Sequence, residues 1–153
     1  MSIHDRIRRF GGLINVYKRH EDALARRMRD AEALALRERA QLTNIEDIKS
    51  DYRKELADAG RAGTSAQRMK NWQRFVHNLD AVHTEQMERT RKAAGARDAH
   101  RDAWLAQYRR VKGFETLAEN LEADRDAQQR RGERRQMDEI ASRPVRPDKQ
   151  REK

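Results

Sequence analysis

Proline is absent from the first 143 residues of this 153-residue chain and occurs only at Pro144 and Pro147. Proline is the strongest helix breaker, because it lacks a backbone N–H and its ring clashes with the preceding turn. The residues that dominate the chain, Ala, Leu, Glu, Gln, Lys, Arg and Met, are strong helix formers. The first 143 residues can therefore form very long helices without meeting an obligatory stop.

The composition excludes an ordinary compact globule. Only 36% of the residues are hydrophobic and 5% are aromatic, whereas 40% are charged. A globule of this length needs more apolar side chains to offset the conformational entropy lost on folding. The composition suits either a disordered chain or a long helical rod with a thin apolar seam. The helix formers and the lack of proline favour the rod.

The charge pattern indicates solvated helix faces. The net charge is +9, which would suit nucleic acid, an anionic membrane or an acidic protein surface. Acidic and basic residues alternate, however, as in residues 37–39 and 51–55. Cysteine is absent, which excludes disulfides and thiol chemistry. No apolar run reaches the length of a signal peptide or a membrane span, so we expect a cytoplasmic protein.

The clearest break in the helical pattern lies at residues 59–65. Gly60 and Gly63 end a helix readily and permit a turn. Thr64, followed three residues later by Gln67, predicts a capping box for a second helix.

The sequence therefore predicts an all-α fold, a long two-helix antiparallel coiled coil. We expect one domain over residues 1–141, a helical hairpin with helices at about 12–59 and 66–140 and a turn at 60–65. The first helix is expected to start at the double glycine Gly11-Gly12, which interrupts the preceding segment. Residues 142–153, which contain both prolines, are expected to form a disordered basic tail.

The first helix carries a sustained heptad seam. Its steps of four and three residues pass through Leu24, Met28, Ala31, Ala35, Glu38, Leu42, Ile45, Lys49, Tyr52, Leu56 and Ala59. The second helix shows a looser apolar stripe, with a period near 3.6 residues. That stripe contains Phe75, Leu79, Val82, Ala93, Trp104, Tyr108, Val111, Phe114, Ala118 and Leu121. Trp72 and Val76 lie off the stripe, so we expect them to face outward and to contact a partner.

The sequence offers no constellation for chemistry, and we expect neither an enzyme nor a bound cofactor or metal. His77 and His83 flank Asp80, but their spacing is only partly cofacial on a helix and suits solvated positions better than zinc. The Gly60-x-x-Gly63 loop lacks the strand and lysine of a phosphate-binding loop. The basic residues from 125 to 153 offer nucleic acid a purely electrostatic contact, and residues 3–17 offer a membrane a short amphipathic helix.

Two segments resemble the FliJ family of flagellar export proteins. The first begins the second helix, and the second closes it near the end of the pattern. They read Gln67-Arg68-Met69-Lys70-Asn71-Trp72-Gln73-Arg74-Phe75-Val76-His77-Asn78-Leu79 and Gln136-Met137-Asp138-Glu139-Ile140-Ala141. Chain length, turn position and paired helices fit the same family, so the resemblance covers nearly the whole chain.

The resemblance implies a stalk-like component of the flagellar type III export apparatus, similar to the coiled coil of the rotary ATPase gamma subunit. Proteins of this family bind the hexameric export ATPase at one end and the cytoplasmic domain of the membrane export gate at the other. They also bind export chaperones. The implied location is cytoplasmic and peripheral at the cytoplasmic face of the inner membrane, through these partners.

The resemblance also implies two sets of binding residues. The gate-binding set maps by spacing onto both helices near the turn, at Gln41, Ile45, Ile48, Tyr52, Phe75, Leu79, Val82 and Gln86. Gln86 departs from the family's residue type. The end that holds both termini would face the ATPase, where the basic candidates are Arg8, Arg9, Arg131 and Arg135.

Three other functions fit the same pattern. One is a structural or scaffolding coiled coil unrelated to secretion, and another is the equivalent stalk of an injectisome. A third is a basic coiled coil that binds duplex DNA, although the mixed charge and lack of interleaved aromatic residues disfavour it. No nucleic-acid partner is expected.

Overall fold

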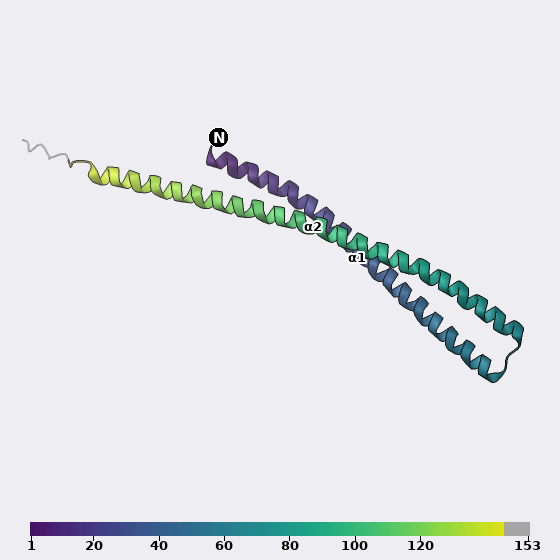
Figure 1. Cartoon of the computed structure of the whole chain (residues 1–153). Coiled ribbons are helices and arrows are strands. Elements are labelled where there is room, and N and C mark those ends of the chain that lie inside the picture. The colour runs from purple at the N-terminus through teal and green to yellow at the C-terminus, as the bar shows by residue number, and fades with distance from the viewer. Residues whose placement is uncertain (146–153) are drawn as a thin grey trace, which may run out of the picture. The chain divides into compact units, whose positions relative to one another are not determined.

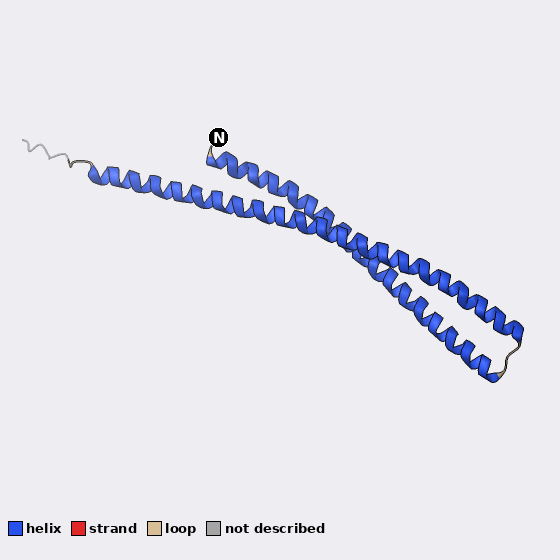
Figure 2. Ribbon diagram, viewed as in Figure 1, coloured by secondary structure: helices blue, strands red, loops and turns tan. Residues whose placement is uncertain are grey.

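The computed structural model describes residues 1–145, which form two helices joined by a short turn (Figure 1). Helix α1 spans Ile3–Ala62, 60 residues, and helix α2 spans Ala66–Ser142, 77 residues. The described part of the chain contains no strand (Figure 2). The predicted all-α fold with two long antiparallel helices is therefore confirmed. Most of the predicted disordered tail, residues 146–153, lies outside the described residues.

The packing divides into two units, and both helices pass through both of them. Unit 1 contains Met1–Lys18 of the first helix and α2 from Arg109 onward. Unit 2 contains Arg19–Tyr108, which includes the turn. That residues 1–141 behave as one domain stays a prediction.

Helix α1 begins nine residues earlier than expected. Its first turn is capped by Ser2 and Asp5, since the Asp5 amide donates to Ser2 Oγ at 3.2 Å and the Ser2 amide donates to Asp5 Oδ2 at 3.3 Å. This reciprocal pair is a capping box, which stabilises a helix start. Gly11 and Gly12 lie on the exposed face of α1 and weaken it by only about 1 kcal/mol each. The expected start at residue 12 was wrong because a glycine pair alone does not end a well-capped helix.

The turn is shorter than expected and is built by Gly63 and Ser65. Gly63 follows the last residue of α1 with a φ of 78°, a left-handed conformation that glycine adopts without strain. The Arg68 amide donates to Ser65 Oγ at 3.2 Å. Ser65 is therefore the N-cap of α2, one residue after the Thr64 that the sequence suggested.

The predicted seam of α1 is correct and longer than expected. Every residue of the predicted line from Leu24 to Ala59 is buried or half-buried. The alternating steps of four and three residues continue towards the N-terminus. Each seam residue there is also half-buried: Ile3, Ile7, Phe10, Ile14, Tyr17 and Glu21. The early part of α1 is therefore paired with α2 in unit 1, as the rest of α1 is in unit 2.

The predicted stripe of α2 was partly wrong, because the seam of α2 is a strict heptad in which polar residues occupy several positions, mainly between His83 and Gln107. Its buried and half-buried members, at steps of three and four, are Met69, Trp72, Val76, Leu79, His83, Gln86, Thr90, Ala93, Arg97, His100, Trp104, Gln107, Val111, Phe114, Ala118, Leu121 and Arg125. Trp72 and Val76 thus face α1, and the expectation that they face outward was wrong. Phe75 and Val82, which were assigned to the stripe, are instead 42% and 48% exposed.

Candidate functional site

The two flanks of the helix seam differ in chemistry. One flank, called here the charged flank, carries ion pairs between the helices. In unit 1, Lys18 Nζ lies 3.0 Å from Glu115 Oε1. In unit 2, Arg101 Nη2 lies 3.1 Å from Glu32 Oε1, and Arg53 pairs with Asp80 at 3.5 Å. Such half-exposed pairs each add little stability, but together they fix which residues of α1 and α2 face each other.

The opposite flank of unit 2 is apolar and accessible. It is called here the unit 2 apolar flank and consists of Leu34, Gln41, Ile48, Phe75 and Val82. The exposed fractions are 41% for Leu34, 44% for Ile48, 42% for Phe75 and 48% for Val82. Large apolar side chains gathered on one side of a thin helix pair have no further layer of this chain to cover them. This flank is therefore the best candidate for a protein-binding site in unit 2.

The eight residues that the family resemblance assigned to gate binding fall into two layers. Gln41, Ile48, Phe75 and Val82 lie on the unit 2 apolar flank and are exposed. Ile45, Tyr52, Leu79 and Gln86 lie beneath them on the seam. The rings of Tyr52 and Phe75 join the layers, with centroids 4.6 Å apart at an interplanar angle of 57°. The structure thus brings the eight residues together, but only four of them are exposed.

Gln86 serves the packing of the helix pair. It is only 5% exposed, and its Nε2 donates to the Glu38 carbonyl oxygen at 3.0 Å and to Glu38 Oε2 at 2.6 Å. Thr90 Oγ1 also donates to the Glu38 carbonyl oxygen, at 3.2 Å. These bonds satisfy a polar group at the centre of the seam and tie α2 to one turn of α1. The departure of Gln86 from the family's residue type therefore has a structural explanation.

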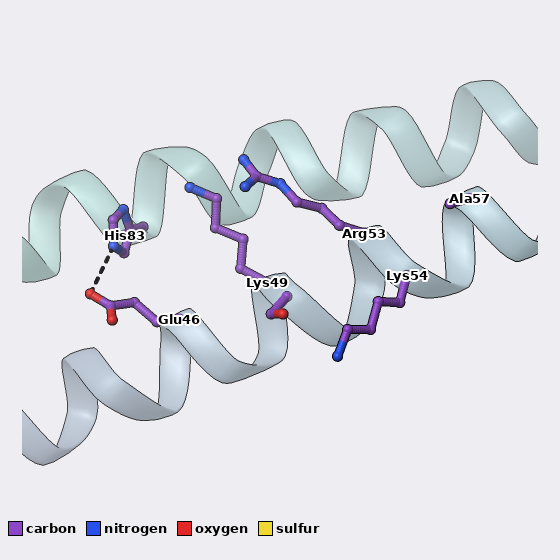
Figure 3. A pocket seen from close by; sticks show the side chains of 7 residues that line it. Glu46, Lys49, Arg53, Lys54, Ala57 and His83 are labelled. Carbon is purple, nitrogen blue, oxygen red and sulfur yellow. Dashed lines mark hydrogen bonds and ion pairs between the residues drawn. The ribbon is translucent and has the colours of Figure 1, made fainter.

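The charged flank near the turn surrounds a hollow lined mainly by charged and polar side chains (Figure 3). Lys49 and Arg53 reach from α1 towards α2, where Asp80 pairs with both. His83 Nε2 lies 3.3 Å from Glu46 Oε1. The hydrogen bond from Lys49 lowers the pKa of the Asp80 carboxyl, and the positive charges of Lys49 and Arg53 add to this effect.

The same contacts show what Asp80 and His83 do. Asp80 is engaged by Lys49 and Arg53, and His83 by Glu46, so the side chains point to partners across the helix pair. Within residues 1–145, no three side chains of His, Cys, Asp or Glu gather as metal ligands. The arrangement is that of interhelical ion pairs.

Unit 1 is held by an aromatic cluster. Phe114 of α2 stacks on Tyr17 with centroids 5.0 Å apart and an angle of 8°, and it contacts Phe10 at 6.1 Å. The Arg110 guanidinium lies 5.9 Å from the Tyr17 ring centroid. Beside the cluster, hydrogen bonds from Lys18 and then Lys112 lower the pKa of Glu115. These contacts fix the level at which α1 meets α2 in unit 1.

The four basic residues assigned to the ATPase-facing end all lie in unit 1 and are exposed. Arg8 and Arg9 lie in the second turn of α1, and Arg131 and Arg135 lie near the end of α2. None of the four forms an ion pair with another residue of the described chain. From Gln128 to Ser142 every residue of α2 is exposed, so this last stretch is available for contact on all sides.

Sequence reasoning missed Leu34 and, in unit 1, Leu13 and Leu117, which are 39% and 50% exposed. A seven-residue spacing could have revealed Leu34, because Leu34, Gln41 and Ile48 repeat at that interval. In the part of the chain that the structure describes, neither helix is apolar enough over a sufficient length to cross a bilayer.

Comparison with known proteins identifies the family. The model of the family described as Flagellar FliJ protein matches residues 6–149. The Flagellar FliJ protein of Escherichia coli (strain K12) is 25% identical over 103 residues, which cover 67% of this chain and 70% of that protein. No solved structure gives a significant match. Because the family model spans nearly the whole sequence and the paired helices carry the two segments that resemble it, this chain belongs to the FliJ family of flagellar proteins.

Proposed function

We propose that this chain, a component of the flagellar export apparatus by its family, links the export ATPase ring to the membrane export gate. It acts by binding and positioning other proteins and catalyses no reaction. Its place is the cytoplasm, at the cytoplasmic face of the inner membrane, where it is held by its partners. Binding of export chaperones is part of the same proposal.

The observation that carries the gate-binding proposal is the unit 2 apolar flank. Three of its side chains, Ile48, Phe75 and Val82, are between 42% and 48% exposed. The seam beneath keeps them in place, since Tyr52 packs against Phe75 and Ile45 is only 6% exposed. A preorganised apolar patch loses little entropy when a partner covers it.

The ATPase-facing end is assigned to unit 1, which contains both termini. The support is electrostatic, because Arg8, Arg9, Arg131 and Arg135 are exposed and have no acidic partner within residues 1–145. Such guanidinium groups attract carboxylates on a partner and speed its association. A clear consequence is that salt should weaken binding at this end more than gate binding.

The test of gate binding is the double variant Tyr52→Ala/Phe75→Ala. We expect the affinity for the cytoplasmic domain of the export gate to fall by roughly tenfold or more, because the variant removes Phe75 from the apolar flank and also removes the Tyr52 ring that packs against it from the seam. Calorimetric titration with the purified gate domain measures the affinity, and far-ultraviolet circular dichroism checks that the helices persist.

The matched control is Leu36→Ala, which removes a large apolar side chain that is 69% exposed but lies away from the apolar flank. Leu36→Ala should leave gate affinity unchanged. If Tyr52→Ala/Phe75→Ala stays helical and binds the gate domain as the unaltered chain does, the site assignment is wrong.

A further inference from the structure

Unit 1 contains a second patch of exposed apolar side chains. Leu13 is 39% exposed, Leu117 is 50% exposed and Val16 is 60% exposed. Leu13 follows the seam residue Phe10 by three positions, and Leu117 follows the seam residue Phe114 by three. None of the three was noticed in the sequence, because none lies on a seam.

Packing in unit 1 brings Leu13 and Leu117 to one level and one side. Phe114 contacts both Phe10 and Tyr17, so the turn of α1 between them, which contains Leu13, lies opposite Phe114. In an antiparallel helix pair, equivalent flanking positions of the two helices lie on the same side of the seam. The Lys18–Glu115 ion pair occupies the other side. Leu13 and Leu117, with Val16 one turn beyond Leu13, therefore form a unit 1 apolar flank.

Basic groups without acidic partners border this patch. Arg6 and Arg9 line a hollow of about 400 Å³ together with Met1, Phe10 and Leu13. Neither Arg6 nor Arg9 forms an ion pair within the described chain. A guanidinium group that has no carboxylate in its own chain, beside exposed apolar side chains, suits a partner that offers both carboxylates and apolar groups.

We infer that the unit 1 apolar flank docks a protein surface with an apolar centre and a rim of carboxylates, borne by the export ATPase. This inference rests on the proposed function, which assigns unit 1 to the ATPase and ascribes the contact to charge alone. Here Leu13, Leu117 and Val16 supply the buried centre of the contact. Arg6 and Arg9 supply its edge, where exposed charges steer association and set orientation more than they hold the complex.

A protein partner fits this patch better than a lipid surface. A helix that lies on a bilayer needs a broad apolar face to bury among the acyl chains. The broad apolar face of α1 in unit 1, from Ile3 through Phe10 to Tyr17, already packs against α2. Among the large apolar side chains of residues 1–18, only Met1, Leu13 and Val16 are exposed, which is too little for stable binding to a membrane.

The experiment compares two variants of the full chain in titrations with the purified export ATPase at low and high salt. Leu13→Ser/Leu117→Ser should weaken binding by roughly tenfold at both salt concentrations, because it removes apolar contact area that salt does not screen. Arg6→Gln/Arg9→Gln should weaken binding mainly at low salt and flatten its salt dependence. Leu36→Ser is the matched control, since it removes from unit 2 a leucine that is even more exposed, at 69%, and should bind as the unaltered chain does.

Each outcome decides the inference. If the unaltered chain binds the ATPase and Leu13→Ser/Leu117→Ser binds equally well, the inference is overturned and the proposed function stands. Failure of the unaltered chain to bind overturns both. Vesicles that contain one-third anionic phospholipid are the second probe. If the vesicles bind the unaltered chain more tightly than Leu13→Ser/Leu117→Ser, while both chains bind the ATPase equally well, the patch contacts lipid. That result would overturn the inference of a protein partner.

Discussion

At the scale of single residues, Asp80 links the two helices of unit 2 through the largest number of charged neighbours. Lys49 and Arg53 pair with it from α1, and the Lys49 hydrogen bond lowers its pKa below the ordinary value for an aspartate. A carboxyl with a lowered pKa in the folded state stabilises that state above its unfolded pKa, near 4. The contribution disappears as the pH falls through the lower, folded-state pKa, when the carboxyl is protonated in both states.

We therefore expect Asp80→Asn to lower the free energy of unfolding at pH 7 and to have a smaller effect at about pH 2, because protonation removes the charge on which the contacts with Lys49 and Arg53 depend. Urea unfolding followed by circular dichroism at the two pH values measures the difference. Asp51→Asn is the control, because Asp51 is exposed and forms no ion pair within residues 1–145. An equal loss of stability at both pH values would show that Asp80 acts through packing and not through its charge.

At the scale of the helices, α1 could be predicted from the sequence and α2 only in part. The seam of α1 is visible because its heptad positions hold Leu, Ile and Ala between Leu24 and Ala59. The heptad of α2 holds His83, Gln86 and Thr90 where apolar residues are expected. These polar groups are accepted in the seam because each finds a partner on α1, which hydrophobicity alone cannot reveal.

The candidate site was affected by the same limit. The family resemblance maps the eight gate-binding candidates by their spacing along the two helices, and that spacing is the same whether a position lies on the flank or on the seam. Which of these residues are exposed depends on which positions of α2 face α1. Gln86 therefore looked like a surface contact, although it lies in the seam and is only 5% exposed.

Gln86→Leu tests the role of the buried polar cluster. Replacing a buried polar residue in a coiled-coil seam by leucine commonly raises stability and relaxes register. We expect the Tm to rise by roughly 3 °C, which corresponds to about 1 kcal/mol of added stability in a chain of this length. We also expect some molecules to pair their helices in a register shifted by one heptad. Because the chain has no cysteine, disulfide trapping can report register without background.

Two cysteine pairs distinguish the registers. Ile48→Cys with Val82→Cys should cross-link in the native register, whereas Ile48→Cys with Arg89→Cys should cross-link only after a shift of seven residues. The second pair should cross-link in the Gln86→Leu background and not in the parent chain. If Gln86→Leu lowers the Tm and leaves the second pair unlinked, the cluster does not control register.

The double glycine of α1 provides a second prediction for this helix. Gly11 and Gly12 are exposed and helical, and a Cβ added at either would meet no atom within 4 Å. Gly11→Ala/Gly12→Ala should raise the Tm by roughly 5 °C, since each change adds about 1 kcal/mol of helix propensity. Gly63→Ala, where φ is 78°, should instead lower the Tm although it also meets open space. Thermal melts followed at 222 nm check both signs.

At the scale of the whole molecule, each helix belongs to both units, and α2 has buried seam residues on either side of the division. Gln107 on one side of the division is 3% exposed and Val111 on the other is 2% exposed. We therefore expect the two units to unfold together, in line with a single domain over residues 1–141. Both tryptophans, Trp72 and Trp104, lie in unit 2, so their fluorescence reports that unit alone, whereas circular dichroism reports both.

Coincident urea transitions by fluorescence and by circular dichroism would agree with one cooperative domain. A second step seen only by circular dichroism would mean that unit 1 unfolds by itself and would contradict the prediction. Leu117→Trp would then place a reporter in unit 1 and identify the step directly.

The difference between the two flanks makes each unit of this hairpin asymmetric around its long axis. Ion pairs occupy one side of the seam and exposed apolar side chains the other. A docking partner therefore contacts the helix pair from one side only. A hexameric ring that surrounds such an element cannot present the matching surface from all six subunits at once. In the proposed stalk role, one hairpin would therefore contact only part of the ATPase ring at a time.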